Sequence, residues 1–272
     1  DAAFDRRLFL ARRLAENETE AESDGTFYIA SLSTTTLSYK GMVMPEFLAQ
    51  FYPDLADTRM QTPMALFHQR FSTNTLPRWK LAQPFRMLAH NGEINTIRGN
   101  RNWTRARRQL LASPQVPELA EIDPPIAMTG SDSSTLDNML ELLVIGGMPL
   151  PQALRLLVPP AWQTDENLDA DLRAFYEFFA FHQEGWDGPA GLVITDGRWV
   201  VCGLDRNGLR PARWTLTEDR RLIVASETGV VDIPVDQVTA RGRLGPGELL
   251  AADLAKGELL DSNAIDNQLK KL

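Results

Sequence analysis

Two polar runs within one short span constrain this chain more than any other feature. Between His68 and Trp103 lie two of the three histidines, five arginines and five asparagines. In each run an apolar stretch leads directly into polar side chains: residues 64–67 are followed by HQRFSTN, and residues 87–89 by HNGEIN. This layout is typical of a strand that leaves the core and opens into a functional site.

The Asn91-Gly92 pair in the second run has two interpretations. Asn-Gly is the commonest two-residue hairpin turn, and the spacing alone favours this interpretation. A glycine behind an asparagine also suits a tight backbone conformation that leaves N–H groups free to point outward. A backbone N–H beside an Asn amide is what an oxyanion hole requires, because both groups donate to a developing negative oxygen.

A known family shares these runs. The chain resembles the class II glutamine amidotransferase domain of glutamate synthases (the large or ferredoxin-dependent subunit) in HQRFSTNT, in HNGEINTIRGNRNW and in Gly130-Ser-Asp-Ser133. The resemblance covers nearly the whole chain, from about Phe27 to the end. It implies a four-layer αββα sandwich of the N-terminal nucleophile hydrolase type. It assigns residues 1–250 to the amidotransferase domain, and residues 251–272 to the end of that domain and a linker towards a synthase region.

The resemblance implies hydrolysis of the glutamine side-chain amide to glutamate and ammonia. The oxyanion donors map to the Asn91 side chain and the Gly92 N–H. The α-carboxylate of glutamine maps to Arg70, helped by Thr73, because a guanidinium fork fits a carboxylate in bidentate fashion. The α-ammonium group maps to Asp132. An Arg and an Asp that hold opposite ends of a zwitterion form an amino-acid clamp, although from the residues alone a plain ion pair is an equal alternative.

The nucleophile departs from the family pattern. The family uses an N-terminal cysteine whose own α-amino group serves as base, and this chain begins with Asp1-Ala-Ala-Phe4. The single thiol, Cys202, lies in an apolar run and is predicted to be buried and inert. We therefore expect the first strands and the nucleophile on a segment upstream of Asp1, and no glutamine hydrolysis by the chain alone. The alternative is a nucleophile-free relative that binds glutamine or serves as an interaction module.

Composition narrows the function classes further. The net charge of −8 argues against general affinity for nucleic acids. A single cysteine excludes an internal disulfide framework and an all-cysteine metal site. No apolar run approaches the roughly 18 residues that span a bilayer, and the N-terminus lacks the layout of a signal peptide. A cytoplasmic protein that binds no membrane is therefore expected.

The resemblance also implies cofactors and partners outside this chain. Full-length glutamate synthases carry FMN and an iron–sulfur cluster, and none of these is expected within these residues. The implied partners are glutamine, the remaining synthase domains of the same polypeptide, and a small electron-transfer subunit or ferredoxin.

Local patterns predict an α+β layered domain with strands early, helices in the middle and hairpins late. Helices are expected at 5–17, 45–51, from Asn95 onward, 135–145, 151–158 and 169–184, with Asp132 or Ser133 as an N-cap. Strands are expected at 27–32, 34–39, 64–71, 86–90, 190–195, 198–204, 212–217, 221–226, 235–244 and 248–252.

Some finer features also follow from the pattern. Asp196-Gly197 is expected as a hairpin turn, Gly208 at a positive φ, and 261–272 as a helix or linker. The five aromatic side chains of 169–184 are expected to pack into the core.

Overall fold

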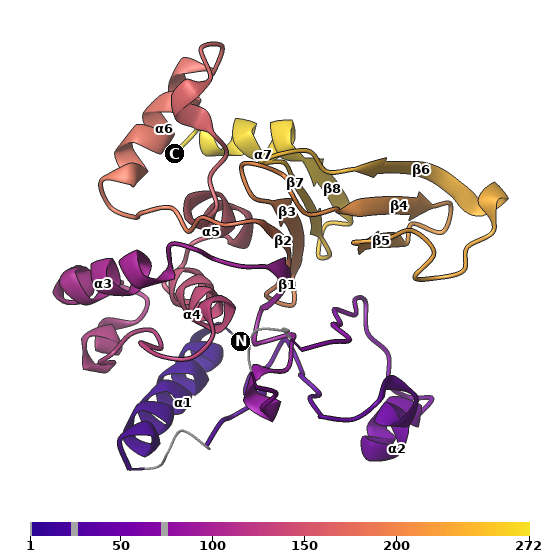
Figure 1. Cartoon of the computed structure of the whole chain (residues 1–272), viewed down its shortest axis with the longest axis horizontal. Helices are drawn as coiled ribbons and strands as arrows, with labels where there is room; N and C mark the ends of the chain where they lie inside the picture. Colours follow the sequence, from indigo (N-terminus) through magenta and orange to yellow (C-terminus); the bar gives the residue numbers. More distant parts are fainter. Residues whose placement is uncertain (1, 23–26, 72–75) are drawn as a thin grey trace. The chain divides into compact units, whose positions relative to one another are not determined.

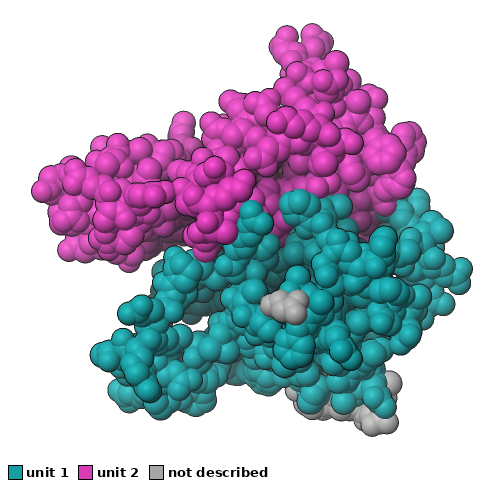
Figure 2. Space-filling model, turned by 180° about the vertical axis from the view of Figure 1, so that it is seen from behind, with its two compact units in different colours: residues 1–89, 101–149, 194–198 teal, residues 90–100, 150–193, 199–272 magenta. Residues whose placement is uncertain are grey.

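The chain folds into helices and strands (Figure 1), and a computed structural model describes residues 2–22, 27–71 and 76–272. Segments far apart in the sequence pack together into two units (Figure 2). Unit 1 comprises residues 1–89, 101–149 and 194–198, and unit 2 comprises residues 90–100, 150–193 and 199–272.

The helices follow the predicted pattern closely. They are α1 (Ala2–Glu22), α2 (Leu48–Phe51), α3 (Ile97–Arg107), α4 (Asp132–Ile145), α5 (Leu150–Leu157), α6 (Ala170–Ala180) and α7 (Ser262–Leu269). Short 3-10 turns occupy several of the connections between them. None of the helices in the described residues combines the length and the apolar character needed to cross a membrane.

Helix α4 supplies much of the core of unit 1. Its N-cap is Ser131, whose side chain accepts from the Ser134 N–H at 3.5 Å. The predicted cap at Asp132 or Ser133 is therefore wrong by one or two residues, because both already lie in the first turn. Beyond that turn the helix buries side chains on most of its surface, among them Leu136, Met139, Leu140 and Leu142.

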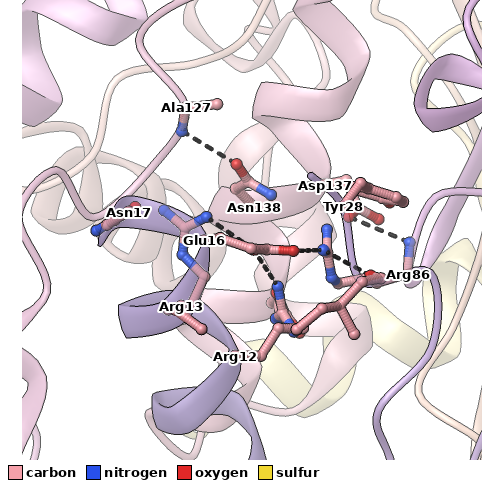
Figure 3. A network of polar contacts seen from close by, with 12 residues as sticks. Arg12, Arg13, Glu16, Asn17, Tyr28, Arg86, Ala127, Asp137 and Asn138 are labelled. Carbon is pink, nitrogen blue, oxygen red and sulfur yellow. Dashed lines mark hydrogen bonds and ion pairs between the residues drawn. The ribbon is translucent and has the colours of Figure 1, made fainter. Parts of the chain in front are cut away.

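Helix α1 is attached to unit 1 through buried charges (Figure 3). Glu16 accepts from Arg12 at 3.0 Å and from Arg13 at 3.5 Å, and it also pairs with Arg86. Arg12 in addition pairs with Glu141 of α4. Because the guanidinium groups of Arg12 and Arg13 are almost fully buried, removing one carboxylate would leave an uncompensated charge inside the unit.

The strands form two sheets. The five-stranded sheet has the order β1 (Leu88–Gly92), β2 (Ala190–Thr195), β3 (Trp199–Leu204), β7 (Leu249–Asp253) and β8 (Glu258–Asp261). The three-stranded sheet has the order β5 (Leu222–Ala225), β4 (Arg213–Thr217) and β6 (Val238–Arg243). The pairs β3–β7, β7–β8, β4–β5 and β4–β6 are antiparallel. Gly197, at φ +90°, lies in the tight turn between β2 and β3, where a hairpin turn was predicted.

Three predicted strands near the N-terminus are wrong. Residues 27–32, 34–39 and 64–71 form no strand in the part of the chain that the structure describes. The Asp5 side chain accepts from the Thr34 N–H at 2.7 Å. This backbone N–H is therefore not available for a hydrogen bond to a neighbouring strand. None of residues 64–71 is buried, and β-propensity without a packed face does not make a strand.

Helix α6 buries only part of its aromatic side chains. Phe175 and Tyr176 are buried, whereas Phe178 is 59% exposed and Phe181, just after the helix, is 83% exposed. The prediction that all five aromatic rings pack into the core is therefore wrong for these two. The helix also ends at Ala180 instead of continuing to Glu184.

The last elements of the chain pack within unit 2. Ile265 and Leu269 of α7 are buried, and Asp266 of the same helix pairs with Arg155 of α5 at 2.9 Å. Residues 261–272 were predicted as a helix or linker, and α7 (Ser262–Leu269) shows that the segment is mainly a helix, while strand β8 was not predicted. The predicted strand at 235–244 begins with a 3-10 turn, so β6 starts only at Val238.

Candidate functional site

Strand β1 carries the HNG residues at one edge of the five-stranded sheet. Its burial falls along the strand, from the buried Leu88 and His90 to the exposed Asn91 and the half-buried Gly92. From Gly92 the chain continues towards α3 without returning as a second strand. The hairpin-turn interpretation of Asn91-Gly92 is therefore wrong.

Strand β1 starts later than predicted because a carboxylate accepts hydrogen bonds from the backbone N–H groups at its beginning. Asp137 of α4 accepts from the N–H groups of Arg86 at 3.3 Å, Met87 at 2.8 Å and Leu88 at 3.0 Å. β1 therefore begins at Leu88 and not at Arg86, and its start is fixed to α4 within unit 1. Burial raises the pKa of Asp137, and the nearby Arg86 guanidinium and these N–H groups oppose that rise.

Gly92 lies against the neighbouring backbone of unit 2. Its φ is +147°, and a Cβ at this position would lie 1.8 Å from the Pro189 carbonyl oxygen and 2.8 Å from the Ala190 Cα. The next residue, Glu93, donates its N–H to the same carbonyl at 3.1 Å. Only glycine fits such a close approach, so the motif requires this residue for a physical reason.

The segment 185–190 also fixes the start of α3. The Asp187 carbonyl accepts from the Asn95 N–H at 2.8 Å, and the Asp187 N–H donates to the Thr96 hydroxyl at 2.9 Å. The Asn100 amide donates to the Gly185 carbonyl at 3.1 Å. Residues 92–100 are thus held along their length by one neighbouring segment.

Asp205, to which the sequence pattern gave no role, begins the turn after β3. It is buried after β3, and its carboxylate accepts from the N–H groups of Ala190 at 3.0 Å and Asn207 at 2.9 Å. The available signal was an Asp directly before an Arg-Asn-Gly turn, a common cap for such turns. Gly208 in this turn has φ +60°, which confirms the predicted positive φ.

Asp132 begins α4, and the loop before it is held by Arg101. The Arg101 guanidinium donates to the carbonyls of Thr129 and Gly130, both at 3.1 Å, and to the Thr135 hydroxyl at 2.7 Å. Burial lowers the pKa of Arg101, and the charge of Asp132 opposes that effect. The GSDS run thereby takes a defined path into the helix.

Arg70 has an exposed side chain in the irregular stretch before residue 72, and its N–H donates to the His68 Nδ1 at 3.3 Å. Thr73 lies outside the described residues. Arg70 and Asp132 belong to unit 1, and Asn91 and Gly92 belong to unit 2. Asn91 and Gly92 are adjacent on β1.

Cys202 is buried in β3, as predicted, opposite Leu250 of β7. Apolar side chains pack around it, including Leu204 and Leu244. Burial raises the pKa of its thiol to about 12, so the reactive thiolate is suppressed at neutral pH. Within the described residues, no group of three or more His, Cys, Asp or Glu side chains is placed to bind a metal ion.

Comparisons with a family model and with individual relatives both point to the glutamine amidotransferases of glutamate synthases. The whole chain, residues 1–272, matches the family model described as glutamine amidotransferases class-II. It is 45% identical over 273 residues to the glutamate synthase [NADPH] large chain of Azospirillum brasilense, covering 100% of this chain and 18% of that relative. It is 46% identical over 273 residues to the glutamate synthase [NADH] of Saccharomyces cerevisiae, covering 100% of this chain and 12% of that relative.

The chain thus spans less than a fifth of the length of these relatives. Among solved structures, it is similar to a glutamine phosphoribosylpyrophosphate amidotransferase from B. subtilis, with a TM-score of 0.37 and 20% identity. That match covers 71% of this chain and 33% of the other.

Proposed function

The chain belongs to the class II glutamine amidotransferases, and from this premise we propose that it works as part of the glutaminase of a glutamate synthase. In this role it takes part in hydrolysing the side-chain amide of glutamine to glutamate and ammonia. The ammonia then serves glutamate synthesis from 2-oxoglutarate. Membership also confirms the predicted fold class, the α+β fold of the N-terminal nucleophile hydrolase type.

The observation that carries the proposal is the backbone at Gly92. Attack on the amide carbon creates a negatively charged oxygen, which the Asn91 amide and the Gly92 N–H would stabilise. Such donors are effective when they are fixed before the reaction begins. The Pro189 carbonyl restricts Gly92 from one side, and the Glu93 N–H bond to that carbonyl holds the next peptide at 3.1 Å.

The clamp for the amino-acid end of glutamine consists of Arg70, Thr73 and Asp132. The exposed Arg70 guanidinium would bind the α-carboxylate through paired hydrogen bonds, with Thr73 as a further donor. Asp132, at the first turn of α4, would bind the α-ammonium group. Opposite charges at the two positions select a zwitterion over a simple amide.

The attacking thiol in this proposal is not Cys202, because that side chain is buried and its thiol pKa is raised to about 12. Since Cys202 is the single cysteine here, the nucleophile would be a cysteine that is not among these 272 residues, acting with its own α-amino group as base.

The relation to glutamate synthases implies FMN and an iron–sulfur cluster for the whole polypeptide, and the cluster does not fit this chain. An iron–sulfur cluster requires about four thiolate ligands, and the chain has one cysteine. We assign both groups to other domains of the same polypeptide, together with the contact to a small electron-transfer subunit or ferredoxin. No step of the chemistry above passes through them.

The test is glutamate release from glutamine by the whole polypeptide that the gene encodes. Arg70→Lys removes the paired geometry but keeps the charge, so KM for glutamine should rise about 10- to 100-fold, as for the loss of a charge-assisted hydrogen bond. Asp132→Asn should act in the same direction. Arg78→Lys, at an exposed arginine of unit 1, is the matched control and should change nothing.

Two outcomes would contradict the proposal. If Arg70→Lys has unchanged KM and kcat, the clamp assignment is wrong. If calorimetry shows that the whole polypeptide binds glutamine but releases no ammonia, the nucleophile-free binding module is the better description.

A further inference from the structure

Asp205 is a buried carboxylate with both oxygens engaged by backbone. One oxygen accepts from the Ala190 N–H at 3.0 Å and the other from the Asn207 N–H at 2.9 Å. Its own N–H donates to the Ala190 carbonyl at 3.0 Å. Asp205 therefore holds residue 190 through both of its backbone polar groups.

Asp205 is itself firmly anchored. Its carbonyl accepts from the Gly208 N–H at 3.0 Å and from the Gly247 N–H at 2.9 Å. The neighbouring Arg206 pairs with Asp187 at 2.5 Å, which ties the same turn to the segment 185–190 a second time. A side chain held on this many sides transmits its position to whatever it contacts.

Residue 190, which Asp205 holds, connects Asp205 to the proposed oxyanion donors through its neighbour Pro189. Residue 190 follows Pro189, whose carbonyl crowds Gly92 and accepts from the Glu93 N–H at 3.1 Å. The peptide that Asp205 holds, between Pro189 and Ala190, is thus the one against which Gly92 rests. All of these residues belong to unit 2.

We propose that Asp205 is a positioning residue for the oxyanion hole. By fixing the Pro189–Ala190 peptide, it sets the direction of the Gly92 N–H without touching the substrate. The inference rests on the proposed glutaminase function. An oxyanion forms only in the transition state, so a displaced Gly92 N–H slows turnover and leaves glutamine binding nearly unchanged.

The chain offers a matched control in Asp253. This carboxylate is also buried in unit 2, and it accepts from the N–H groups of Ala255 at 3.1 Å and Lys256 at 3.3 Å. It caps the turn between β7 and β8. Asp205→Asn and Asp253→Asn therefore remove the same charge from similarly buried turn caps, and only the first cap contacts residue 190.

The experiment combines kinetics with hydrogen exchange in the whole polypeptide. Asp205→Asn should lower kcat about 100-fold, as expected when a reacting geometry shifts by about 1 Å, with KM changed less than about twofold. The Glu93 amide should exchange faster in this variant. Asp253→Asn should leave kcat unchanged and speed exchange only near Ala255 and Lys256.

Each result decides the inference. An unchanged kcat in Asp205→Asn overturns it, and so does an equal loss of kcat in Asp253→Asn, because the effect would then be general destabilisation. A KM that rises as much as kcat falls would make Asp205 a residue of ground-state binding. Inactive wild-type protein would overturn the proposed function and this inference with it. If Asp205→Ala is also made and does not fold, the isosteric Asp205→Asn still decides.

Discussion

The Pro189 carbonyl oxygen occupies the place where a side chain of residue 92 would begin, 1.8 Å from the position of a Cβ on Gly92. One contact therefore has two effects. It excludes every residue except glycine at this position, and the Glu93 N–H bond to the same carbonyl at 3.1 Å holds the peptide that follows Gly92. The chemistry proposed here depends on this packing of backbone against backbone.

Gly92→Ala should be damaging for both stability and turnover. The φ of +147° alone is strained for alanine by about 1–3 kcal/mol, and the clash with Pro189 adds to that strain. Thermal unfolding and glutamate release measure the two effects. Gly99→Ala is the control, because a Cβ there meets no atom within 4 Å and alanine gains about 1 kcal/mol in a helix. Equal changes in stability for the two variants would contradict the packing argument.

Asn91→Ala should lower kcat roughly 100- to 1,000-fold, which is the effect of removing one oxyanion donor. Glutamine binding should change far less, because the oxyanion is absent in the ground state. Steady-state kinetics of the whole polypeptide separate the two parameters. Asn102→Ala, at an exposed position of α3, should behave as wild type. A KM that rises in proportion to the loss of kcat would make Asn91 a ground-state contact.

Because of Lys40, the free energy of unfolding should change with pH in the range above about pH 7. Burial lowers the pKa of its amine from 10.5 to about 7, against the raising effects of Asp137 and Glu16 and with a further lowering by Arg86. Between these two values the unfolded chain binds more protons than the folded chain, so the free energy of unfolding rises with pH. Below about pH 7 this contribution to the pH dependence vanishes.

Urea unfolding of wild type and Lys40→Met at pH 7, 8.5 and 10 measures the effect. All other titrating groups are common to both proteins, so their difference isolates Lys40. Wild type should gain stability relative to Lys40→Met as pH rises, by at most about 1.4 kcal/mol per pH unit. Parallel pH profiles would show that the amine keeps its ordinary pKa in the folded protein.

Cys202 should be unreactive in the folded protein. A thiol probe at pH 8 should label it only after denaturation, because burial raises the thiol pKa to about 12 and blocks access. Cys202→Ala should retain full glutaminase activity in the whole polypeptide. Rapid labelling of native protein would contradict the burial of the thiol. Activity lost with this substitution would indicate that Cys202 is the nucleophile.

The sequence predicted features that depend on local pattern. Helices α4 and α5 and strands β2 to β4 follow from apolar periodicity and turn residues within their own length. The predicted strand at 34–39 is wrong because the side chain of Asp5, on a helix far away in the sequence, accepts from the Thr34 N–H at 2.7 Å. A single sequence shows which residues can form such a bond, but not which two segments meet.

The candidate site also depends on contacts between segments that a single sequence does not show. The family motifs predict Asn91 and Gly92 as site residues. Their local spacing favoured a hairpin turn, which is wrong because the chain continues from Gly92 towards α3 without returning as a second strand. Asp205 was recognisable as a turn cap through its bond to Asn207, two residues on. Its second bond, to Ala190 on another strand, carries its proposed role and has no local signature.

The ion pairs that attach α1 also give this attachment its own temperature dependence. Glu16 lies among the guanidinium groups of Arg12, Arg13 and Arg86, all withdrawn from water. The hydration that these ions lose becomes less favourable on heating, while the gain from burying apolar surface levels off. Warming therefore weakens the attachment of α1 less than it would weaken a purely apolar contact, and cooling favours release of the helix into water.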